Sequence, residues 1–246
     1  MMNDITVIIP TSVLPSHPST SIIEETISTV RHHLPESEII LQIDGLREEQ
    51  QDRKTDYDEY KNRILWKCLH EYKNILPVVF DEHLHQSGML KKTIDLIETP
   101  LLLYIEGDAP LTPDRIIDWE KCIKFIFDGH ANTIRFHFEA IIPKPHENLM
   151  LGLENGFMKT IQWSQRPYLS TVLYHKDVVL PNTRPKLFIE DSFYAIPIND
   201  YNDNGVIGWN KHRLWIYHPD GDIKRSYHLD GRAGGKKFTS DDEVGL

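Results

Sequence analysis

Two carboxylates at the end of an apolar run are the residues of this chain best placed to do chemistry. Glu106 and Asp108, with Gly107 between them, directly follow the apolar run at residues 99–105, which is typical of a buried central strand. Charged side chains do not fit inside such a strand. Both acids are therefore predicted to emerge at its carboxyl end, where ligands bind in open α/β sheets. Because two carboxylates in this spacing can share a divalent cation and leave room for phosphate oxygens, the pattern predicts a metal–diphosphate site.

The competing interpretation of this motif is structural. An aspartate after a strand can serve as the N-cap of the following helix instead of binding a metal. Thr112 followed by Pro113, however, predicts a separate helix start a few residues later, with proline at the first helical position. The sequence therefore favours the metal interpretation of Glu106 and Asp108.

Three more acids are predicted at strand ends or in loops. Asp44 follows the apolar run at residues 38–43 and precedes Gly45. Glu190 and Asp191 lie among aromatic residues in the segment 188–193. For this pair the alternative is a helix N-terminus, where the helix dipole favours acidic side chains.

The first half of the chain alternates between predicted strands and helices. The first helix has a capping-box pattern, Ser21 with Glu24 three residues later. The charged segment 47–58 is either the start of a helix or a mobile flap. The alternation predicts an α/β fold with a mostly parallel sheet and helices on both faces. Strands are predicted at residues 5–10, 38–43, 75–80 and 99–105, and helices at 21–34, 57–72 and 90–97.

The second half of the chain follows a different pattern. Residues 116–127 predict a helix, and residues 133–138 alternate apolar and polar side chains as a half-buried strand does. Further strands are predicted at 168–175 and 214–218, with a turn at 219–222. We expect this half to form a C-terminal lobe beside the parallel sheet.

Composition bounds the location and the partners. The chain has 246 residues and a formal net charge of −10, which disfavours general binding to nucleic acid. No stretch approaches the ~20 apolar residues of a membrane span, and the N-terminus does not resemble a secretion signal. The two cysteines, Cys68 and Cys122, are isolated in helical patterns, as in a reducing compartment. We therefore expect a cytoplasmic protein with no membrane partner.

One segment departs from the acidic average. In residues 211–237 Lys and Arg outnumber Asp, and Trp215, Tyr217 and Tyr227 lie among them. Basic and aromatic side chains together suit an anionic partner.

The motifs of two common nucleotide-binding classes are absent from the sequence. The first predicted strand is not followed by Gly-x-Gly-x-x-Gly, and the chain has no Gly-Lys-Ser/Thr loop. This argues against a dinucleotide oxidoreductase and against a P-loop phosphotransferase.

The order of these motifs carries a resemblance. The chain resembles nucleotide-sugar glycosyltransferases of the GT-A fold, close to the large inverting family 2, over roughly residues 5–194. Four features match in order: Ile8-Ile9-Pro10-Thr11 at the end of the first strand, Asp44-Gly45 at the end of the second, Glu106-Gly107-Asp108 in place of the Asp-x-Asp metal motif, and Glu190-Asp191 in place of the Glu-Asp motif.

The resemblance implies a role for each motif. Pro10, Thr11 and the Glu106-Gly107-Asp108 motif would bind the nucleotide-sugar, and Asp44 would hold its base. Asp108, with Glu106, would bind Mn²⁺ or Mg²⁺. Asp191 would be the general base that deprotonates the acceptor hydroxyl, and Glu190 would bind the acceptor beside it.

Further site residues are expected on less specific grounds. Lys91 could help to neutralise the diphosphate, the alternative being a solvated helix face. His228 could reach the metal, as a late histidine does in several GT-A enzymes, or it could be a plain strand-end histidine. Trp163 could stack against an acceptor ring, with a core position as the alternative. Arg166 and Arg232 are further candidates for binding the acceptor.

The chain also departs from the family pattern. The usual Asp-Asp-Gly-Ser is replaced by Ile43-Asp44-Gly45-Leu46, and the first acid of the metal motif is glutamate. The metal is therefore expected to contact mainly Asp108. The loop at residues 12–19 is longer and richer in proline than the family pattern.

The resemblance also implies an organisation and a reaction. Residues 1–110 would bind the nucleotide-sugar, 111–233 would bind the acceptor and carry the catalytic base, and 234–246 would form a flexible tail. The opening resembles a branch of phages and bacteria, some members of which decorate modified DNA bases. We therefore expect an inverting transfer, from UDP-sugar first of all, to a hydroxymethylated pyrimidine in phage DNA, which would place a phage-encoded enzyme in the cytoplasm of its bacterial host.

Other functions stay open from the sequence. The acceptor could be a cell-surface or other carbohydrate. A nucleotidyltransferase also uses paired acids on a nucleotide-binding fold, although it normally has a Gly-rich basic loop after the first strand. A non-catalytic binding module would not need the retained acid pairs. A glycoside hydrolase uses two carboxylates but does not need a nucleotide-type sheet. The oligomeric state is not predicted.

Overall fold

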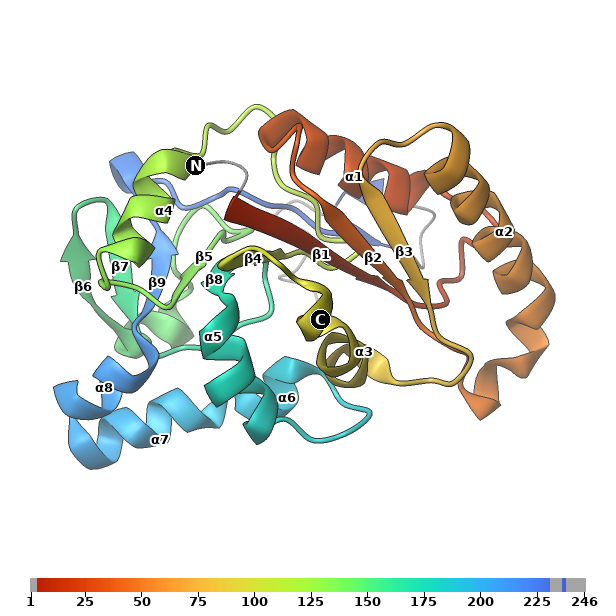
Figure 1. Cartoon of the computed structure of the whole chain (residues 1–246). Helices are drawn as coiled ribbons and strands as arrows, with labels where there is room; N and C mark the ends of the chain where they lie inside the picture. Colours follow the sequence, from red (N-terminus) through yellow and green to blue (C-terminus); the bar gives the residue numbers. More distant parts are fainter. Residues whose placement is uncertain (1–3, 231–235, 238–246) are drawn as a thin grey trace.

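A nine-stranded sheet forms the centre of the molecule, in the spatial order β3-β2-β1-β4-β8-β5-β9-β7-β6 (Figure 1). The structure is a computed structural model that describes residues 4–230 and 236–237. The strands are β1 Ile5–Thr11, β2 Ile39–Ile43, β3 Ile75–Val79, β4 Leu101–Tyr104, β5 Thr133–Arg135, β6 Met150–Glu154, β7 Phe157–Thr160, β8 Tyr168–Thr171 and β9 Leu214–Tyr217, and a separate pair joins β10 Leu229–Asp230 to β11 Lys236–Lys237.

The first four strands form the parallel half of the sheet. β3, β2, β1 and β4 are all parallel, with β1 in the middle of the four. The strand predictions for this half are confirmed to within two residues at each end. Since parallel strands point the same way, the acids that follow β2 and β4 reach the same edge of the sheet.

Helices cover both faces of the sheet, as predicted (Figure 1). Because successive strand residues point to opposite faces, Val7 and Ile9 pack with α1, α2 and α4, whereas Ile8 packs with α3, α5 and α6. The helices are α1 Ser21–His33, α2 Lys54–His70, α3 His85–Thr93, α4 Trp119–Phe127, α5 Val172–Tyr174, α6 Ile189–Phe193, α7 Ala195–Asn204 and α8 Val206–His212. Within the described residues, no helix is long and apolar enough to span a bilayer.

Two predicted helix starts are corrected. The N-cap of α1 is Thr20, whose hydroxyl donates to the Glu24 carboxylate, so the capping box on Ser21 does not form. The helix predicted from residue 116 begins at Trp119, where Asp118 Oδ1 accepts a hydrogen bond of 3.0 Å from the backbone N–H of Lys121.

The charged segment 47–58 is a helix start. A 3₁₀ turn, Glu48–Arg53, continues directly into α2. Thr112 and Pro113 form a turn instead of a cap, because the backbone N–H of Thr112 donates to Arg225 O (2.9 Å) and ties this segment to the end of the chain.

Beyond β4 the sheet becomes mixed. β8 lies antiparallel between β4 and β5, and the β9-β7-β6 edge is antiparallel, whereas β5 and β9 are parallel. The strand predicted at 168–175 stops at Thr171, because its hydroxyl accepts from the backbone N–H of Tyr174 and starts α5. The β6–β7 hairpin was not predicted, although Asn155-Gly156, with φ of 53° and 80°, is a common signal for a two-residue turn.

Candidate active site

Two cavities meet at the carboxyl ends of the parallel strands. The first has a volume of about 240 Å³ and the second about 500 Å³, and Glu106 and Phe188 line both. The remaining lining residues of the first cavity are Pro10, Thr11, Ser12, Leu14, Asp44, Arg47, His83, His85, Gln86, Met89, Gly107 and Asp108. Those of the second are His137, Phe138, Glu139, His146, Gln162, Ser164, Gln165, Arg166, Glu190 and Asp191.

Gly107 sets the two acids of the metal-like motif by packing closely on the end of β1. Its backbone N–H donates to Pro10 O (3.0 Å), and its carbonyl accepts from Thr26 Oγ1 (2.7 Å). A β-carbon at this position would lie 3.1 Å from Pro10 O and 3.3 Å from Ile23 Cδ1. A side chain at this position would be crowded by the backbone of Pro10 and the side chain of Ile23. The acid motif is held rigidly against the neighbouring strand.

His228 lies beside Asp108, and its role as a metal ligand stays a prediction from the resemblance. Its Nε2 is 3.5 Å from Asp108 Oδ2. The contact is supported by the backbone, because the N–H of Leu229 donates to Asp108 O (2.7 Å). Residues 228 and 229 are thus held along the acid motif, although His228 is 120 residues away from Asp108 in sequence.

The charge state of Glu106 fits a cation at this place. Burial, and then the negative charge of Asp108, raise the pKa of Glu106 to about 8. A cation between the two acids would favour their ionised forms. Two carboxylates and an imidazole are suitable ligands for Mn²⁺, and the carboxylates also suit Mg²⁺. In the part of the chain that the structure describes, no three such side chains already converge as ligands. Closure around a metal would therefore need side-chain movement.

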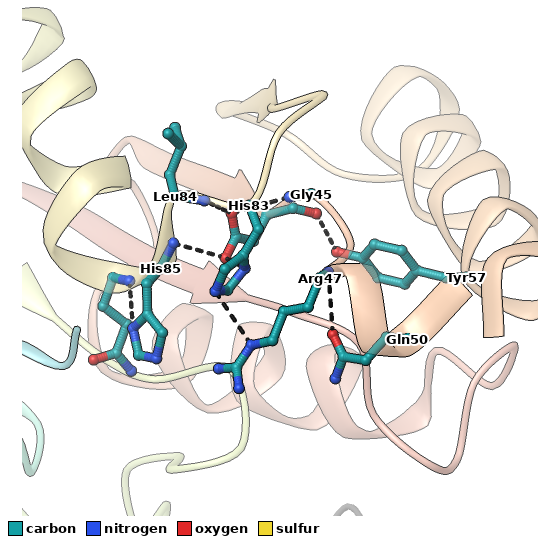
Figure 2. A network of polar contacts seen from close by, with 9 residues as sticks. Gly45, Arg47, Gln50, Tyr57, His83, Leu84 and His85 are labelled. Atoms are coloured by element: carbon teal, nitrogen blue, oxygen red, sulfur yellow. Dashed lines mark hydrogen bonds and ion pairs between the residues drawn. The ribbon is translucent and has the colours of Figure 1, made fainter. Parts of the chain in front are cut away.

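Asp44 is the centre of a hydrogen-bond network at the end of β2. Figure 2 labels its partners Gly45, Tyr57, His83, Leu84 and His85. The side chain of Asp44 is 1% exposed. Oδ1 accepts from the backbone N–H groups of Gly45 (2.9 Å) and Leu84 (2.8 Å). Oδ2 accepts from the N–H of His85 (3.0 Å) and lies 2.8 Å from Nδ1 of His83. Three backbone N–H donors and the imidazole of His83 therefore surround this carboxylate.

The network gives Asp44 a structural role that the sequence did not indicate. It fixes the loop before α3 against the end of β2, and Tyr57 donates to its carbonyl oxygen (2.6 Å). Only glycine fits at position 45, where a β-carbon would lie 2.4 Å from the carbonyl carbon of Glu82. The contact between Asp44 and a nucleotide base stays a prediction, and a base would have to displace one of the present donors.

His83 and Arg47 extend this network into the first cavity (Figure 2). Nε of Arg47 lies 3.2 Å from Nε2 of His83. Because arginine can only donate, Nε2 of His83 is the acceptor, and the ring proton is on Nδ1, facing Asp44. The guanidinium of Arg47 is exposed and brings a positive charge to the cavity wall. It is suited to a phosphate or another planar anion.

The acid pair of the second cavity has one fixed and one exposed member. The backbone N–H of Glu190 donates to Gln165 Oε1 (3.1 Å), and the N–H of Gln165 donates to Glu190 Oε2 (3.1 Å). Glu190 is therefore clamped at the start of α6. Asp191, one position later, is exposed in the cavity. An exposed carboxylate beside a clamped one can meet a hydroxyl group of a ligand.

Two arginines bring positive charge near these acids. The guanidinium of Arg166 lies 3.5 Å from the ring centroid of Phe138. Arg135 is 3% exposed; its Nη2 donates to Gln162 Oε1 (3.1 Å), while Nε and Nη1 have no hydrogen-bond partner among the described residues. Burial lowers the pKa of Arg135 to about 10, against the charge of Glu190, which raises it. Arg135 therefore stays cationic at neutral pH.

Some of the other predicted site residues line the cavities, and others do not. Pro10, Thr11 and Arg166 line the cavities. Lys91 does not: it is exposed on α3, whose buried side carries Met89, so the solvated-face alternative holds. Arg232 lies outside the described residues, as does most of the predicted tail at 234–246.

The prediction for Trp163 is corrected. Its side chain is 2% exposed and belongs to the core, with its ring 4.9 Å from that of Phe193 and 5.2 Å from that of Tyr168. It lines neither cavity, so it does not offer a face to an acceptor ring. Phe188 is the exposed aromatic residue at the junction of the cavities. The sequence indicated it only as part of the aromatic segment 188–193 around the acid pair.

The basic segment 211–237 does not form a basic aromatic surface in its described part. Trp215, Tyr217 and Tyr227 are all buried. Nζ of Lys211 pairs with Oδ1 of Asp200 at 2.7 Å. The aromatic residues of this segment build the core.

The sequence did not single out Arg47, His83, Gln86 and Gln165. Arg47 lies in the segment that was open between helix and flap. The glutamines are neutral and carry no pattern that sequence reasoning could use, although Gln165 adjoins the candidate Arg166.

Comparisons with known proteins define the fold. No protein-family model and no curated protein matches the chain. Among solved structures, S. aureus TarS 1–349 is 14% identical with a TM-score of 0.52, covering 91% of this chain and 60% of that one. The mannosyltransferase PcManGT of Pyrobaculum calidifontis, in complex with GDP-Man and Mn²⁺, is 16% identical with a TM-score of 0.54, covering 89% and 55%.

The fold is the GT-A fold. The fold predicted from the resemblance is thereby confirmed. The chain spans a little over half of the length of these structures.

Proposed function

We propose that this protein is a metal-dependent glycosyltransferase that moves a sugar from a nucleotide-sugar to a hydroxyl acceptor with inversion. One observation carries the proposal. The two cavities meet at Glu106, with the Asp108–His228 pair on the first side and the exposed carboxylate of Asp191 on the second. A single-step transfer with inversion needs this arrangement, because the leaving group and the attacking group must lie on opposite sides of the transferred sugar.

In this proposal the first cavity holds the nucleotide-sugar. Asp108, Glu106 and His228 would bind the metal, which acts as a Lewis acid on the diphosphate leaving group. Arg47 adds a positive charge on the cavity wall. The Mn²⁺ and GDP-Man of the mannosyltransferase of similar fold support a donor of this class. UDP-sugars remain the first donors to test.

The second cavity would hold the acceptor. Asp191 would accept the proton of the acceptor hydroxyl as its oxygen attacks the anomeric carbon. Glu190, clamped by Gln165, would orient the acceptor beside it. Attack from the side opposite the leaving diphosphate inverts the anomeric centre.

The lining of the cavities supports the proposed organisation. Apart from Phe188, the first cavity is lined by residues of the half 1–110, and apart from Glu106, the second is lined by residues of 111–233. The donor-binding and acceptor-binding halves thus correspond to the parallel and mixed parts of one sheet.

For the acceptor, a hydroxymethylated pyrimidine in phage DNA is proposed first. The buried aromatic residues of segment 211–237 take away one support of this choice, whereas Arg166 and Phe138 offer a cation and a ring in the second cavity. The competing acceptor is a carbohydrate. DNA containing hydroxymethylcytosine or hydroxymethyluracil, offered with a panel of nucleotide-sugars, should gain the mass of one sugar per base. Transfer to saccharides alone would reject the DNA acceptor and keep the glycosyltransferase.

The reaction class itself is tested by nucleotide release. Wild-type protein with a UDP- or GDP-sugar should release the nucleoside diphosphate in the presence of Mn²⁺ and stop in excess EDTA. Release of pyrophosphate from a nucleoside triphosphate and a sugar phosphate would instead identify a nucleotidyltransferase.

A further inference from the structure

We propose that Gln86 and Gln165 form a hydrogen-bonded relay that couples the carboxylate of Glu106 to the position of Glu190, and that this relay sets the two halves of the active site relative to each other. The inference rests on the proposed function for its catalytic meaning. The relay itself is a feature of the folded chain and can be tested without a substrate.

The relay consists of three consecutive hydrogen bonds. The backbone N–H of Glu190 donates to Oε1 of Gln165 (3.1 Å). Nε2 of Gln165 donates to Oε1 of Gln86. Nε2 of Gln86 donates to Oε1 of Glu106. The relay therefore runs from the first turn of α6 to the acid motif after β4 and crosses the junction of the two cavities.

The direction of the relay is fixed by its ends. A backbone N–H can only donate, so the oxygen of the Gln165 amide must face Glu190. Its NH₂ group then faces Gln86, which must present its own oxygen and turn its NH₂ group to Glu106. Both amide orientations follow from the neighbouring groups, without an arbitrary choice of oxygen and nitrogen. Aligned amide dipoles in such a chain strengthen one another.

The surroundings favour a relay of this kind over a chance contact. Gln165 is 4% exposed, so its amide has little access to competing water. It is held a second time by its own backbone N–H, which donates to Glu190 Oε2, and its Nε2 lies 3.4 Å from the hydroxyl of Tyr104. Burial makes an unmade hydrogen bond costly, which favours the single arrangement that satisfies all members.

The relay assigns positioning roles to two neutral residues. Gln165 lines only the second cavity, yet it orients Gln86, which holds the Glu106 carboxylate beside Asp108. Loss of Gln165 should therefore weaken metal and donor binding in the first cavity, where it has no wall position. A purely local role would change the second cavity alone.

The test compares matched glutamine-to-methionine substitutions. Gln165→Met should weaken Mn²⁺-dependent UDP binding, measured by calorimetry without acceptor, by about threefold to tenfold, the effect of one lost hydrogen bond. Gln162→Met makes the same change in the second cavity outside the relay, and should alter the UDP dissociation constant by less than about twofold. If Gln165→Met binds UDP as wild type does, the relay is rejected while the proposed function stands.

A thermal double-mutant cycle tests the relay without any ligand. The Tm values of Gln86→Met, Gln165→Met and the double variant should be non-additive, because both single changes break the same bond. Additive shifts would reject the relay. Should Gln165→Met not fold, Gln165→Glu replaces it, since it keeps an acceptor for Glu190 N–H and removes the donor to Gln86. If wild type binds no UDP with Mn²⁺, the proposed donor fails, and the cycle alone decides the relay.

Discussion

The two cavities are built in different ways, although they share a wall. Each strand of the parallel half contributes a wall residue to the first cavity at or just after its carboxyl end. These residues are Thr11 at the end of β1, Asp44 after β2, His83 after β3 and Asp108 after β4. The second cavity is built mainly from loops of the mixed half, with Glu106 its sole wall residue from a parallel strand end among those described. Parallel strands bring their ends to one edge by geometry alone. The loops follow strands of the mixed half, where β8 pairs antiparallel with β4 and β5.

This difference separates two kinds of function. The first cavity has an acid motif held by backbone contacts and a buried carboxylate, Asp44, that accepts three backbone N–H hydrogen bonds. The second has an exposed carboxylate, Asp191, beside Phe188, an exposed ring that lines both cavities. A fixed site suits the common part of a donor, a nucleoside diphosphate. A site built from loops can vary with the acceptor.

The largest effect should come from the metal motif. Asp108→Asn keeps the shape of the side chain and removes its charge, so metal binding and turnover should fall by about 10³-fold or more, since a bound cation supplies several kcal/mol. Nucleotide release is the assay, with Mn²⁺ titrated to excess. Turnover that survives in this variant, or in wild type with EDTA, would remove the metal from the proposal. Neither cavity would then have a metal site to distinguish it from the other.

The next largest effect should separate the cavities. Asp191→Asn removes the proposed base and should lower kcat by about 10²–10⁴-fold. Donor binding should stay within about twofold of wild type, because Asp191 does not line the first cavity. Calorimetry with UDP and Mn²⁺ checks this. Weak donor binding in a folded Asp191→Asn protein would place Asp191 on the donor side.

A third variant probes the rigidity of the first cavity. Asp44→Ala leaves the N–H groups of Leu84 and His85 without their acceptor and should lower the free energy of unfolding by at least about 1–3 kcal/mol. UDP binding should weaken with it, for free UDP as well as for the sugar conjugate. Denaturant unfolding and calorimetry give the two numbers. Asp81→Ala, an exposed neighbouring acid, is the control. Unchanged affinity for UDP would show that the loop before α3 does not serve the nucleotide.

The sequence predicted the first cavity, at the ends of the parallel strands, better than it predicted contacts between distant segments. Apolar runs ending in acids placed Asp44, Glu106 and Asp108 at one edge, because in a parallel sheet this depends on local pattern and strand direction only. The resemblance added His228, whose approach to Asp108 depends on a chain segment far away in sequence. The proposed role of Trp163 in the acceptor site was wrong, because an aromatic residue a few positions before an arginine has the same sequence pattern in a core as in a binding site.

The remaining errors have a physical cause as well. The helix start at Trp119 depends on the side chain of Asp118, which accepts a hydrogen bond from the backbone N–H of Lys121, and the end of β8 depends on the hydroxyl of Thr171. Neither has a periodicity. The polar relay is invisible in sequence for a stronger reason: a glutamine has the same pattern whether its amide meets water or another amide.

The smallest effect should distinguish two cations beside the first cavity. Arg47 lines it, whereas Lys91 is exposed on α3 and lines neither cavity. Arg47→Ala should weaken UDP binding by about threefold to tenfold, because a charge-assisted hydrogen bond to a phosphate or base is lost, but partial exposure and screening limit its strength. Lys91→Ala should leave the affinity within about twofold, since a solvated cation adds little. Raising the salt concentration should reduce the Arg47 effect. If Lys91→Ala has the larger effect, α3 must turn toward the donor on binding, and the first cavity would be less fixed than the comparison with the second implies.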